Sequence, residues 1–337
     1  MPEVSFANLV VAATAMVFSG SAFAVDRLVP QQYQTIQAAI DASANGDVVQ
    51  VSPGSHPGPV DLRGKMIVLR GTTSPEMTIV TGGGSVLRCA SGELQSTVIE
   101  NLTFANGGAD RGGGAFLLGS SPVIRNCRFS GNAAGSQGGG MYIEGGMPRI
   151  EGCMIAANTI QVGLGFGAGI CVANSSAIVV DCLISGNLIT GSVGNSCGGG
   201  KGAGVFVSGA AAPTFERCTI AGNQNTVFAT GCCTTIGPGA TFEGPANVTD
   251  CVIRDNSAVG CGNPAAVNFS NNSVYVRGTK ICGNTGPTQT TGAFVSLGGN
   301  VISATCPITC PGDLNSDGFV DGDDLGRLLS NWGPCTN

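Results

Sequence analysis

The sequence predicts an all-β fold in which short strands stack as successive coils of a solenoid. Three observations predict it. A short phrase repeats along the chain, apolar and polar residues alternate inside each copy, and glycine, at 55 of 337 residues, supplies the turns between copies. Side chains of a strand point to opposite faces in turn, so this alternation indicates strands. A self-similar period of this length indicates a stacked array of equivalent units.

The repeated phrase is clearest between residues 123 and 187. Asn-Cys-Arg-Phe-Ser-Gly-Asn at 126–132 returns as Gly-Cys-Met-Ile-Ala-Ala-Asn at 152–158 and as Asp-Cys-Leu-Ile-Ser-Gly-Asn at 181–187. Other copies are found at 102–106, 218–223, 251–256 and 279–284, which makes seven rungs. The cysteine and the Phe or Ile two places later are expected to point inward. The closing asparagines are expected to adopt left-handed backbone and to stack as a hydrogen-bonded ladder at one corner.

Each period also contains a second apolar run that follows a cluster of glycines. These runs lie at 114–117, 140–143, 169–172, 204–207 and 292–295. A turn, often with proline as at Pro122, Pro148 and Pro213, then leads into the next rung. We therefore expect three strands per coil, about nine coils and a rod on the order of 40 Å long, from the spacing between parallel strands.

These repeats resemble the right-handed parallel β-helix family, the pectin-lyase-like superfamily, over roughly residues 30–305. The resemblance implies the fold rather than the activity, because this fold hosts lyases, hydrolases, adhesins and surface proteins alike. It also implies an N-terminal helix that covers the open first coil. Residues 35–42 fit this role, with Ile36, Ala39 and Ile40 on one face. Further strands are expected at 46–51, 60–62, 66–69 and 77–80.

Residues 1–24 are expected to be a signal peptide. An apolar run at 9–18 precedes Ala22-Phe23-Ala24, which has the pattern of a cleavage site, so the mature chain is expected to begin at Val25. The segment departs from the usual pattern in having Glu3 and no Lys or Arg before the run. The run is shorter than the roughly 20 residues that a membrane-spanning helix needs, and no other stretch is long enough. We therefore expect a secreted or cell-surface protein. Its mature chain is expected to consist of a β-helix over 25–309 and a tail over 310–337.

The charge distribution excludes one class of partner. Most of the net charge of −6 belongs to the tail after Cys310, and the β-helix itself is nearly neutral. A nucleic-acid-binding protein would carry a basic patch, so no nucleic-acid partner is expected.

Fifteen cysteines fall into two groups. One group occupies the same inward position of successive rungs, where we expect a stack of free thiols, with disulfides between neighbouring rungs as the alternative. It consists of Cys127, Cys153, Cys182, Cys218 and Cys251. The other group lies in loops, where a bridge from Cys197 to Cys232 or Cys233 and one from Cys261 to Cys282 are candidates. Cys310 and Cys335 bracket the tail and are a third candidate pair.

The tail carries the sharpest chemical motif. Residues 313–324 place oxygen donors at loop positions 1, 3, 5, 9 and 12 and a glycine at position 6, which is the arrangement of an EF-hand calcium loop. Position 12 is Asp rather than Glu, and one short helix follows at 325–332 with none before the loop. These features resemble one half of a type I dockerin repeat.

That resemblance implies a Ca²⁺ site in the tail. Its ligands would be the side chains of five residues and the carbonyl of Phe319, the five being Asp313, Asn315, Asp317, Asp321 and Asp324. A complete dockerin has two such copies and this chain has one, which puts a cohesin-like partner in doubt. The alternative is an acidic tail that is only solvated.

No group of residues in the β-helix is singled out as catalytic. Glu100, Arg125 and Glu151 alternate in sign on adjacent rungs, as stabilising cross-strand pairs do. Asp181 and Asp250 fall at turn positions a whole coil apart, and the single histidine, His56, falls in an expected turn.

Two functional hypotheses follow. The first is a non-catalytic, displayed β-helix that binds an extracellular protein or polysaccharide through stacked loops at 159–166, 188–201 and 224–237. The second is a carbohydrate-active enzyme, either a polysaccharide lyase or a glycoside hydrolase. It would require clustered acids and exposed aromatic residues, yet the aromatic residues are expected mostly in the core.

Overall fold

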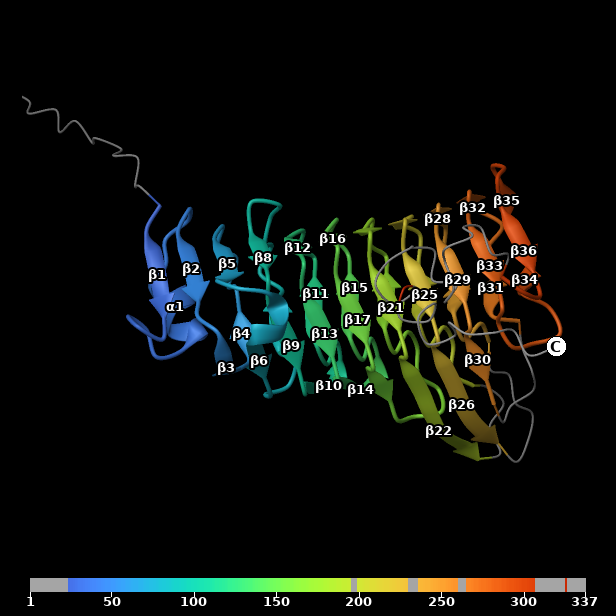
Figure 1. Ribbon diagram of the computed structural model, residues 1–337, viewed down its shortest axis with the longest axis horizontal. Coiled ribbons are helices and arrows are strands. Elements are labelled where there is room, and N and C mark those ends of the chain that lie inside the picture. Colours follow the sequence, from blue (N-terminus) through green and yellow to red (C-terminus); the bar gives the residue numbers. More distant parts are fainter. Residues whose placement is uncertain (1–23, 195–198, 230–235, 260–264, 307–324, 326–337) are drawn as a thin grey trace, which may run out of the picture.

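The computed structural model describes residues 24–194, 199–229, 236–259, 265–306 and 325. Over these residues the chain winds into parallel coils that stack as a rod, with β1 and α1 at one end and β34, β35 and β36 at the other (Figure 1). All strand pairs within the four sheets are parallel, with neighbours contributed by successive coils. The predicted all-β solenoid is thereby confirmed.

Sheets A and B form two sides of each coil. The strands of sheet A are, in order, β1 (Asp26–Val29), β2 (Val48–Val51), β5 (Val68–Gly71), β8 (Val98–Glu100), β12 (Val123–Arg125), β16 (Arg149–Glu151), β20 (Ile178–Val180), β24 (Thr214–Glu216), β28 (Ala246–Thr249), β32 (Val274–Arg277) and β35 (Val295–Ser296). Those of sheet B are β3 (Gly54–Pro57), β6 (Thr78–Thr81), β9 (Thr103–Ala105), β13 (Arg128–Ser130), β17 (Met154–Ala156), β21 (Leu183–Ser185), β25 (Thr219–Ala221), β29 (Val252–Arg254), β33 (Lys280–Cys282) and β36 (Val301–Ser303).

Sheet C forms the third side. Its strands are β4 (Val60–Asp61), β7 (Leu87–Cys89), β11 (Ala115–Leu118), β15 (Met141–Glu144), β19 (Ile170–Ala173), β23 (Val205–Ser208), β27 (Ala240–Phe242), β31 (Val267–Phe269) and β34 (Thr290–Gly292). Nine coils of the described chain therefore contribute a strand to each of the three sheets, in agreement with the expected number.

A fourth sheet corrects the expectation of three strands per coil. Sheet D consists of β10 (Gly108–Arg111), β14 (Ala133–Gln137), β18 (Thr159–Ile160), β22 (Leu188–Gly194), β26 (Gln224–Ala229) and β30 (Ser257–Ala258). The segments expected to be loops at 159–166, 188–201 and 224–237 thus begin as strands that pair with one another. Ile160, Ile189 and Val227 bury their side chains in a small second core, which explains why these segments are ordered as a sheet.

The main core is built from equivalent positions of successive coils. Phe104 and Phe129 stack with ring centroids 5.1 Å apart, and Phe242 and Phe269 stack at 5.6 Å. Beside them the repeated cysteines of the inward column are buried and free, so the alternative of disulfides between rungs is wrong for this column. The Cys182 thiol donates to the carbonyls of Val180 at 3.2 Å and Ile150 at 3.6 Å, and the other column thiols make equivalent contacts. These cysteines act as small buried side chains.

The predicted asparagine ladder is present. Each amide Nδ2 donates to the next Oδ1 at 2.9 to 3.0 Å through Asn132, Asn158, Asn187, Asn223, Asn256 and Asn284. The left-handed residue, however, is the one before each ladder position, such as Gly131 (φ 66°) and Ala157 (φ 55°). This corrects the expected backbone of the asparagines. The glycines before sheet C are required by close packing, because a Cβ at Gly140 would lie 2.8 Å from Nδ2 of Asn158.

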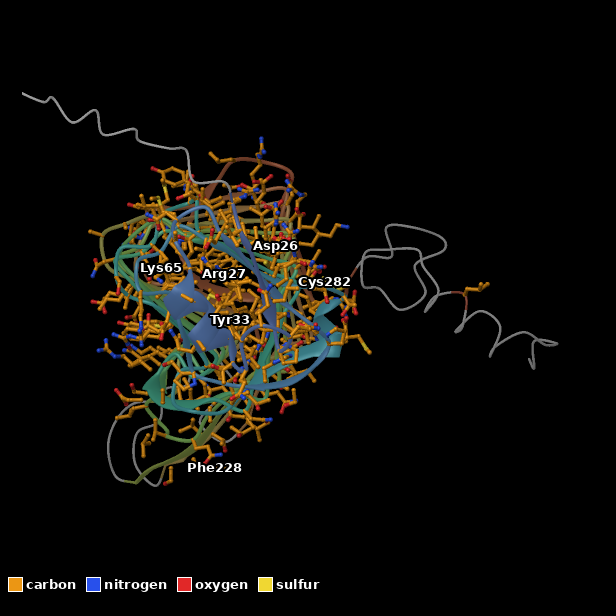
Figure 2. All side chains as sticks on the ribbon, turned by 90° about the vertical axis from the view of Figure 1, so that its left-hand side faces the viewer. Asp26, Arg27, Tyr33, Lys65, Phe228 and Cys282 are labelled. Carbon is orange, nitrogen blue, oxygen red and sulfur yellow. A yellow bond between two sulfur atoms is a disulfide. The ribbon has the colours of Figure 1, made fainter. Side chains whose placement is uncertain are left out.

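The N-terminal end is covered by α1 (Ile36–Ala42), as predicted. Thr35 caps the helix, since its Oγ1 accepts a hydrogen bond from the Ala38 N–H at 3.1 Å, and Ile36, Ala39 and Ile40 are buried. Lys65 Nζ donates to the carbonyls of Ile40, Asp41 and Ser43 at 2.6 to 2.7 Å. Figure 2 looks along the rod from this end and shows Arg27, Tyr33 and Lys65 around the helix.

The first coils agree with the expected strands at 46–51, 60–62, 66–69 and 77–80 within about two residues, as β2, β4, β5 and β6. A short 3-10 helix, η1 (Pro75–Met77), occupies the start of the last of these segments.

The C-terminal end differs from expectation in two respects. The strand expected at 292–295 is divided, because β34 ends at Gly292 and β35 begins at Val295 in a different sheet. Phe294 lies between them and packs on Phe269 with centroids 4.7 Å apart. In addition, Cys282 forms a disulfide with Cys306, so the suggested pairing of Cys282 with Cys261 is wrong. The bridge closes a loop with a sequence separation of 24 that contains the last three strands.

Candidate functional site

Most of the predicted site residues lie outside the described residues. This applies to the calcium ligands Asp313, Asn315, Asp317, Phe319, Asp321 and Asp324, and to the disulfide candidates Cys197, Cys232, Cys233, Cys261, Cys310 and Cys335. Over the part of the chain that the structure describes, no three His, Cys, Asp or Glu side chains gather as a metal site. The calcium site remains a prediction from sequence.

The charged row on sheet A is structural, as predicted. Glu100 accepts hydrogen bonds from the guanidinium groups of Arg70 and Arg125 on the two neighbouring strands. Burial by itself would raise the pKa of Glu100, but Arg125 and Arg70 outweigh it and lower the pKa. Glu151 instead bonds to Arg149 of its own strand at 3.0 Å. A carboxylate held ionised between two guanidinium groups is a poor proton donor.

The other singled-out residues are also structural. Asp181 has the predicted turn conformation (φ 53°) and pairs with Arg217 at 2.7 Å, and Asp250 has the same conformation (φ 52°). His56 lies in β3 rather than in a turn, and its buried ring contacts the carbonyl oxygen of Ser52 through Nε2 at 2.8 Å. It lies in the first coil, and no hydrogen bond from its ring to an acidic side chain is present among the described residues.

The outward face of sheet C carries an aromatic row that the sequence analysis missed. Arg88, Phe116, Tyr142, Cys171 and Phe206 are in register on adjacent strands β7, β11, β15, β19 and β23. Their neighbours in each strand point into the core, so these side chains point outward. The alternation in Ala115-Phe116-Leu117 contained this signal, because a residue between two inward positions must face outward. We call Phe116, Tyr142, Cys171 and Phe206 the aromatic row.

A second column of side chains lies against this row. Gln137, Phe166 and Lys201 pair in parallel where the chain passes from sheet D to sheet C, and Arg111 pairs with Gln137. Phe166 stacks on Phe206 with ring centroids 4.9 Å apart, and Lys201 Nζ lies 5.7 Å from the Phe166 ring and 2.6 Å from Glu243. The two columns together form a strip of aromatic rings edged by charged groups.

Arg111 is the centre of the strip. Its guanidinium lies 4.9 Å from the ring centroid of Tyr142 and donates to the Tyr142 hydroxyl at 3.0 Å. The Tyr142 hydroxyl donates in turn to Glu144 at 2.8 Å, and Arg111 pairs with Glu144 at 3.4 Å. Phe116 stacks on Tyr142 at 5.7 Å and has Arg88 over its ring at 5.2 Å. Arg88, Arg111 and Glu144 all keep more than a third of their side-chain surface exposed.

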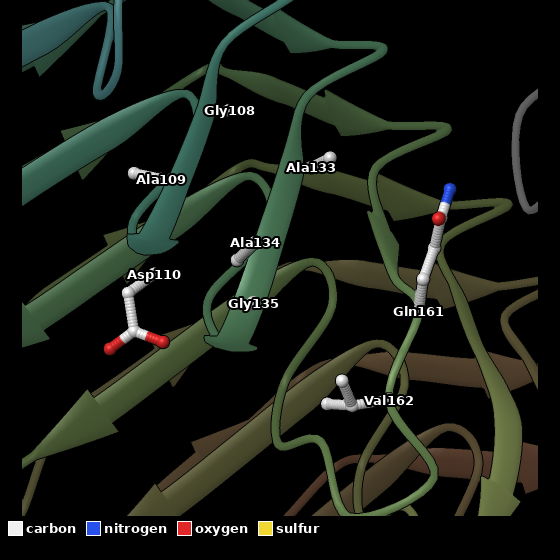
Figure 3. Close-up of a pocket in the computed structure, with 8 residues that line it drawn as sticks. All are labelled: Gly108, Ala109, Asp110, Ala133, Ala134, Gly135, Gln161 and Val162. Atoms are coloured by element: carbon white, nitrogen blue, oxygen red, sulfur yellow. The ribbon is translucent and has the colours of Figure 1, made fainter.

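A shallow pocket adjoins the strip at β10. It has a volume of about 460 Å³ and a floor of small residues from β10 and β14. Asp110, Gln161 and Val162 stand around it (Figure 3). Asp110 directly precedes Arg111, and its negative charge helps to raise the pKa of Arg111, after the larger effect of the Tyr142 hydroxyl. The pocket therefore lies next to the strip along β10, and its lining is mostly small and apolar.

Two side chains of the strip, Tyr142 and Cys171, are held in their protonated forms at neutral pH. Burial and the hydrogen bond to Glu144 raise the pKa of Tyr142 to about 12, so its hydroxyl is protonated at neutral pH. Burial also raises the pKa of the Cys171 thiol, and a thiol rather than a thiolate is a weak nucleophile. Tyr142, Cys171 and Phe206 are at most 5% exposed, so what the strip offers to a ligand is its charged groups and the partly exposed rings of Phe116 and Phe166.

Among the described residues, no helix has the length and apolar character needed to cross a membrane.

The chain matches a protein-family model and several solved structures. A family model described as "Right handed beta helix region" matches residues 64–199 and 95–308. Comparison with curated protein sequences gives no match.

Three solved structures illustrate the structural likeness. Pectin methylesterase from carrot has 13% sequence identity and a TM-score of 0.47, over 83% of this chain and 90% of that chain. Pectate lyase Pel9A has 13% identity and a TM-score of 0.36, over 86% and 80%. The A-module of mannuronan C-5 epimerase AlgE6 from Azotobacter vinelandii has 15% identity and a TM-score of 0.30, over 80% and 94%.

The two ranges matched by the family model together extend from residue 64 to residue 308, which is well over half of the chain. They coincide with the stacked parallel coils of the structure. The chain therefore belongs to the right-handed β-helix family.

Proposed function

We propose that the protein is an exported, non-catalytic β-helix protein that holds an extracellular polysaccharide on the outward face of sheet C. The observation that carries this proposal is the strip in which Arg111 bonds to both Tyr142 and Glu144 beside Phe116. Arginine–carboxylate pairs present several hydrogen-bonding groups in fixed geometry, which suits sugar hydroxyl groups. A partly exposed ring such as that of Phe116 offers an apolar surface to the carbon-bound face of a sugar.

The strip suits an uncharged or weakly charged polymer. Each cation on it has an anionic partner, since Arg88 pairs with Asp61, Arg111 with Glu144 and Lys201 with Glu243. Because these charges balance, no strong field would select an anionic or a cationic ligand. The equivalent outward position holds different residues in successive coils, so an extended chain would meet the charged and aromatic groups of the strip mainly between β7 and β23.

Export and display complete the proposal. The Ala22-Phe23-Ala24 motif supports export, and the Cys282–Cys306 disulfide supports it independently, because disulfides persist mainly in oxidising compartments. The calcium loop at 313–324 would serve to anchor or dock the protein. Calcium titration calorimetry on the purified chain, repeated with Asp313 and Asp317 changed to Ala, tests that part. Saturable binding that is lost in the double variant supports it, and the same heat in both chains contradicts it.

The polysaccharide proposal is tested by binding and turnover on one panel of neutral and acidic polysaccharides. Arg111→Ala is expected to weaken binding of the retained polymer roughly tenfold, which corresponds to about 1.4 kcal/mol. Arg149→Ala is the matched control, because the Arg149–Glu151 pair on sheet A has nearly the same exposure, 37% and 41% against 43% and 38%. Equal weakening by both variants, or no binding to any polymer, would overturn the proposal.

A carbohydrate-active enzyme is the second candidate, and the pocket is the observation that favours it. Asp110 places a carboxylate beside the strip, where an acid would meet a bound polymer. Release of reducing ends or unsaturated products that disappears in Asp110→Asn would establish this alternative. Polymer binding without product release would leave the non-catalytic function.

A further inference from the structure

The side chain of Asp47 joins β1 to the rest of the first coil. It is only 3% exposed. Its Oδ1 accepts a hydrogen bond from the backbone N–H of Val25 at 3.0 Å, and its Oδ2 accepts from Arg27 Nη2 at 2.8 Å and from the N–H of Ala44 at 3.0 Å. Arg27 is held from its other side by the Tyr33 hydroxyl, at 2.7 Å from Nη1.

The partner of Oδ1 has a special place in the sequence. Val25 directly follows Ala22-Phe23-Ala24, after which the chain is expected to be cut. It is also the residue at which β1 joins the sheet, since the N–H of Val48 donates to the Val25 carbonyl at 3.0 Å. The nitrogen that cleavage would release therefore already lies at hydrogen-bond distance from a buried carboxylate.

We propose that Asp47 is a binding site for the α-ammonium group of Val25, which forms when the Ala24–Val25 peptide bond is hydrolysed. One water molecule is consumed, Ala24 leaves with a new carboxylate, and the Val25 nitrogen takes up protons to become an ammonium group. An amide N–H offers Asp47 one neutral hydrogen bond. The ammonium group offers a charge-assisted one, which is shorter and about twice as strong. Removal of the leader thus locks β1 onto the first coil.

The surroundings of Asp47 fit a second positive charge. Burial by itself would raise the pKa of Asp47, but the N–H groups of Ala44 and Val25 and the Arg27 guanidinium outweigh it and lower the pKa. The carboxylate is therefore ionised at neutral pH. Among the residues that the structure describes, Oδ1 accepts a hydrogen bond only from the Val25 nitrogen, whereas Oδ2 accepts those of Arg27. The two cations thus have separate oxygens.

The test compares three full-length mature chains that differ only at the N-terminus. One begins at Val25, one begins at Ala24, and one begins at an N-acetylated Val25. The Ala24 chain has the same charge as the Val25 chain but displaces the ammonium group by one residue. Amide hydrogen exchange of the β1 and β2 peptides is then measured at pH 7. The Val25 chain is expected to exchange about tenfold more slowly than the other two, as about 1.4 kcal/mol requires.

Two variants in the Val25 chain assign the effect. Asp47→Asn is expected to abolish the difference between the three chains, whereas Asp26→Asn, next to the same ammonium group, is expected to preserve it. Equal exchange in the Val25 and Ala24 chains, or a difference that survives Asp47→Asn, would overturn the proposal.

A second measurement avoids any variant that loosens the first coil. The pKa of the α-amino group, about 7.7 to 8.0 when unperturbed, is determined by NMR in the two unblocked chains. Asp47 would raise this pKa in the Val25 chain, although Arg27 opposes the shift. A raised value in the Val25 chain alone supports the proposal, and an unchanged or lowered value contradicts it.

Discussion

At its N-terminal end the stack is covered by α1, which buries Ile36, Ala39 and Ile40, whereas at its C-terminal end apolar side chains remain in contact with water. Leu297 is 57% exposed and Ile302 44% exposed there. The last strands pair with β31, β32 and β33, and the Cys282–Cys306 disulfide adds a covalent link to β33. The two ends of the stack are therefore stabilised differently. At the N-terminal end α1 buries the core of the first coil. At the C-terminal end the disulfide restricts the freedom of the unfolded chain.

The same substitution at both ends gives the largest contrast. Ile40→Ala removes a fully buried side chain from the N-terminal cover and is expected to cost about 4 kcal/mol in the free energy of unfolding. Ile302→Ala, at the exposed end, is expected to cost less than about 0.5 kcal/mol. Denaturant unfolding measures both values. Similar losses would mean that the C-terminal end is covered in solution and that the two ends are alike.

Removal of the disulfide probes the other end. Cys282→Ser is expected to destabilise β34, β35 and β36 by about 3 kcal/mol, because opening a loop with a sequence separation of 24 restores conformational entropy to the unfolded chain. Limited proteolysis should then cut first between residues 283 and 306, while the N-terminal coils stay protected. If cleavage begins near α1 instead, the disulfide does not act locally. Cys89→Ser, which changes a buried free thiol, serves as a control for loss of a cysteine.

The helix end at the N-terminal cover provides a finer test. Lys65→Met keeps the aliphatic stem but removes three hydrogen bonds to the carbonyls that end α1. We expect a loss of about 1.5 kcal/mol, because carbonyl groups at a helix C-terminus lose charged donors. Arg63→Met is the control, since the Arg63–Asp41 pair is exposed and contributes little. The thermal unfolding of both variants is compared with that of the unmodified chain, and equal shifts would contradict the capping role.

Lowering the pH is expected to destabilise the N-terminal end but not the C-terminal end, and this is the smallest of the expected differences in stability. The pKa of Asp47 is lowered in the folded state, so its contribution to stability is complete above the unfolded value of about 3.9 and is lost as pH falls through the lowered value. We expect less than about 1 kcal/mol. The rate at which an acid protease cuts within residues 26–51, relative to the Asp47→Asn chain, measures it. No titratable group belongs to the Cys282–Cys306 bridge, so cutting after residue 283 should show no such dependence on Asp47.

The coils could be predicted because their signal is local. Cys127 and Phe129 two places apart show the alternation of a single strand. The closing asparagine and the glycines before sheet C contact the next coil, but they recur from one period to the next and can be recognised for that reason. The helix over residues 35–42 was predicted on the same basis, since its apolar face is visible in the sequence. Each of these features either recurs along the sequence or is complete within one segment, so a local pattern is enough to recognise it.

The missed features depend on contacts between coils. Strand β22 has Thr, Gly and Ser in its sequence and becomes a strand because β26 pairs with it residue by residue. The aromatic row was missed because aromatic residues in general were expected mostly in the core, although alternation places Phe116 and Tyr142 on the outward face. The partner of Cys282 was missed because a path of three strands brings Cys306 back to it, and no local pattern encodes that return.

The column of free thiols constrains the order of folding and disulfide formation in this chain. Five cysteines at one inward position stay reduced inside the stack, while the bridge at Cys282 forms in the same chain. Exchange between thiols and disulfides requires access to the attacking sulfur. If the coils fold before an oxidant is present, the thiols are buried and cannot react. If the chain is oxidised while it is still unfolded, the thiols would form disulfides in random pairs. The column cysteines of this protein must therefore be buried in folded coils before an oxidant reaches them.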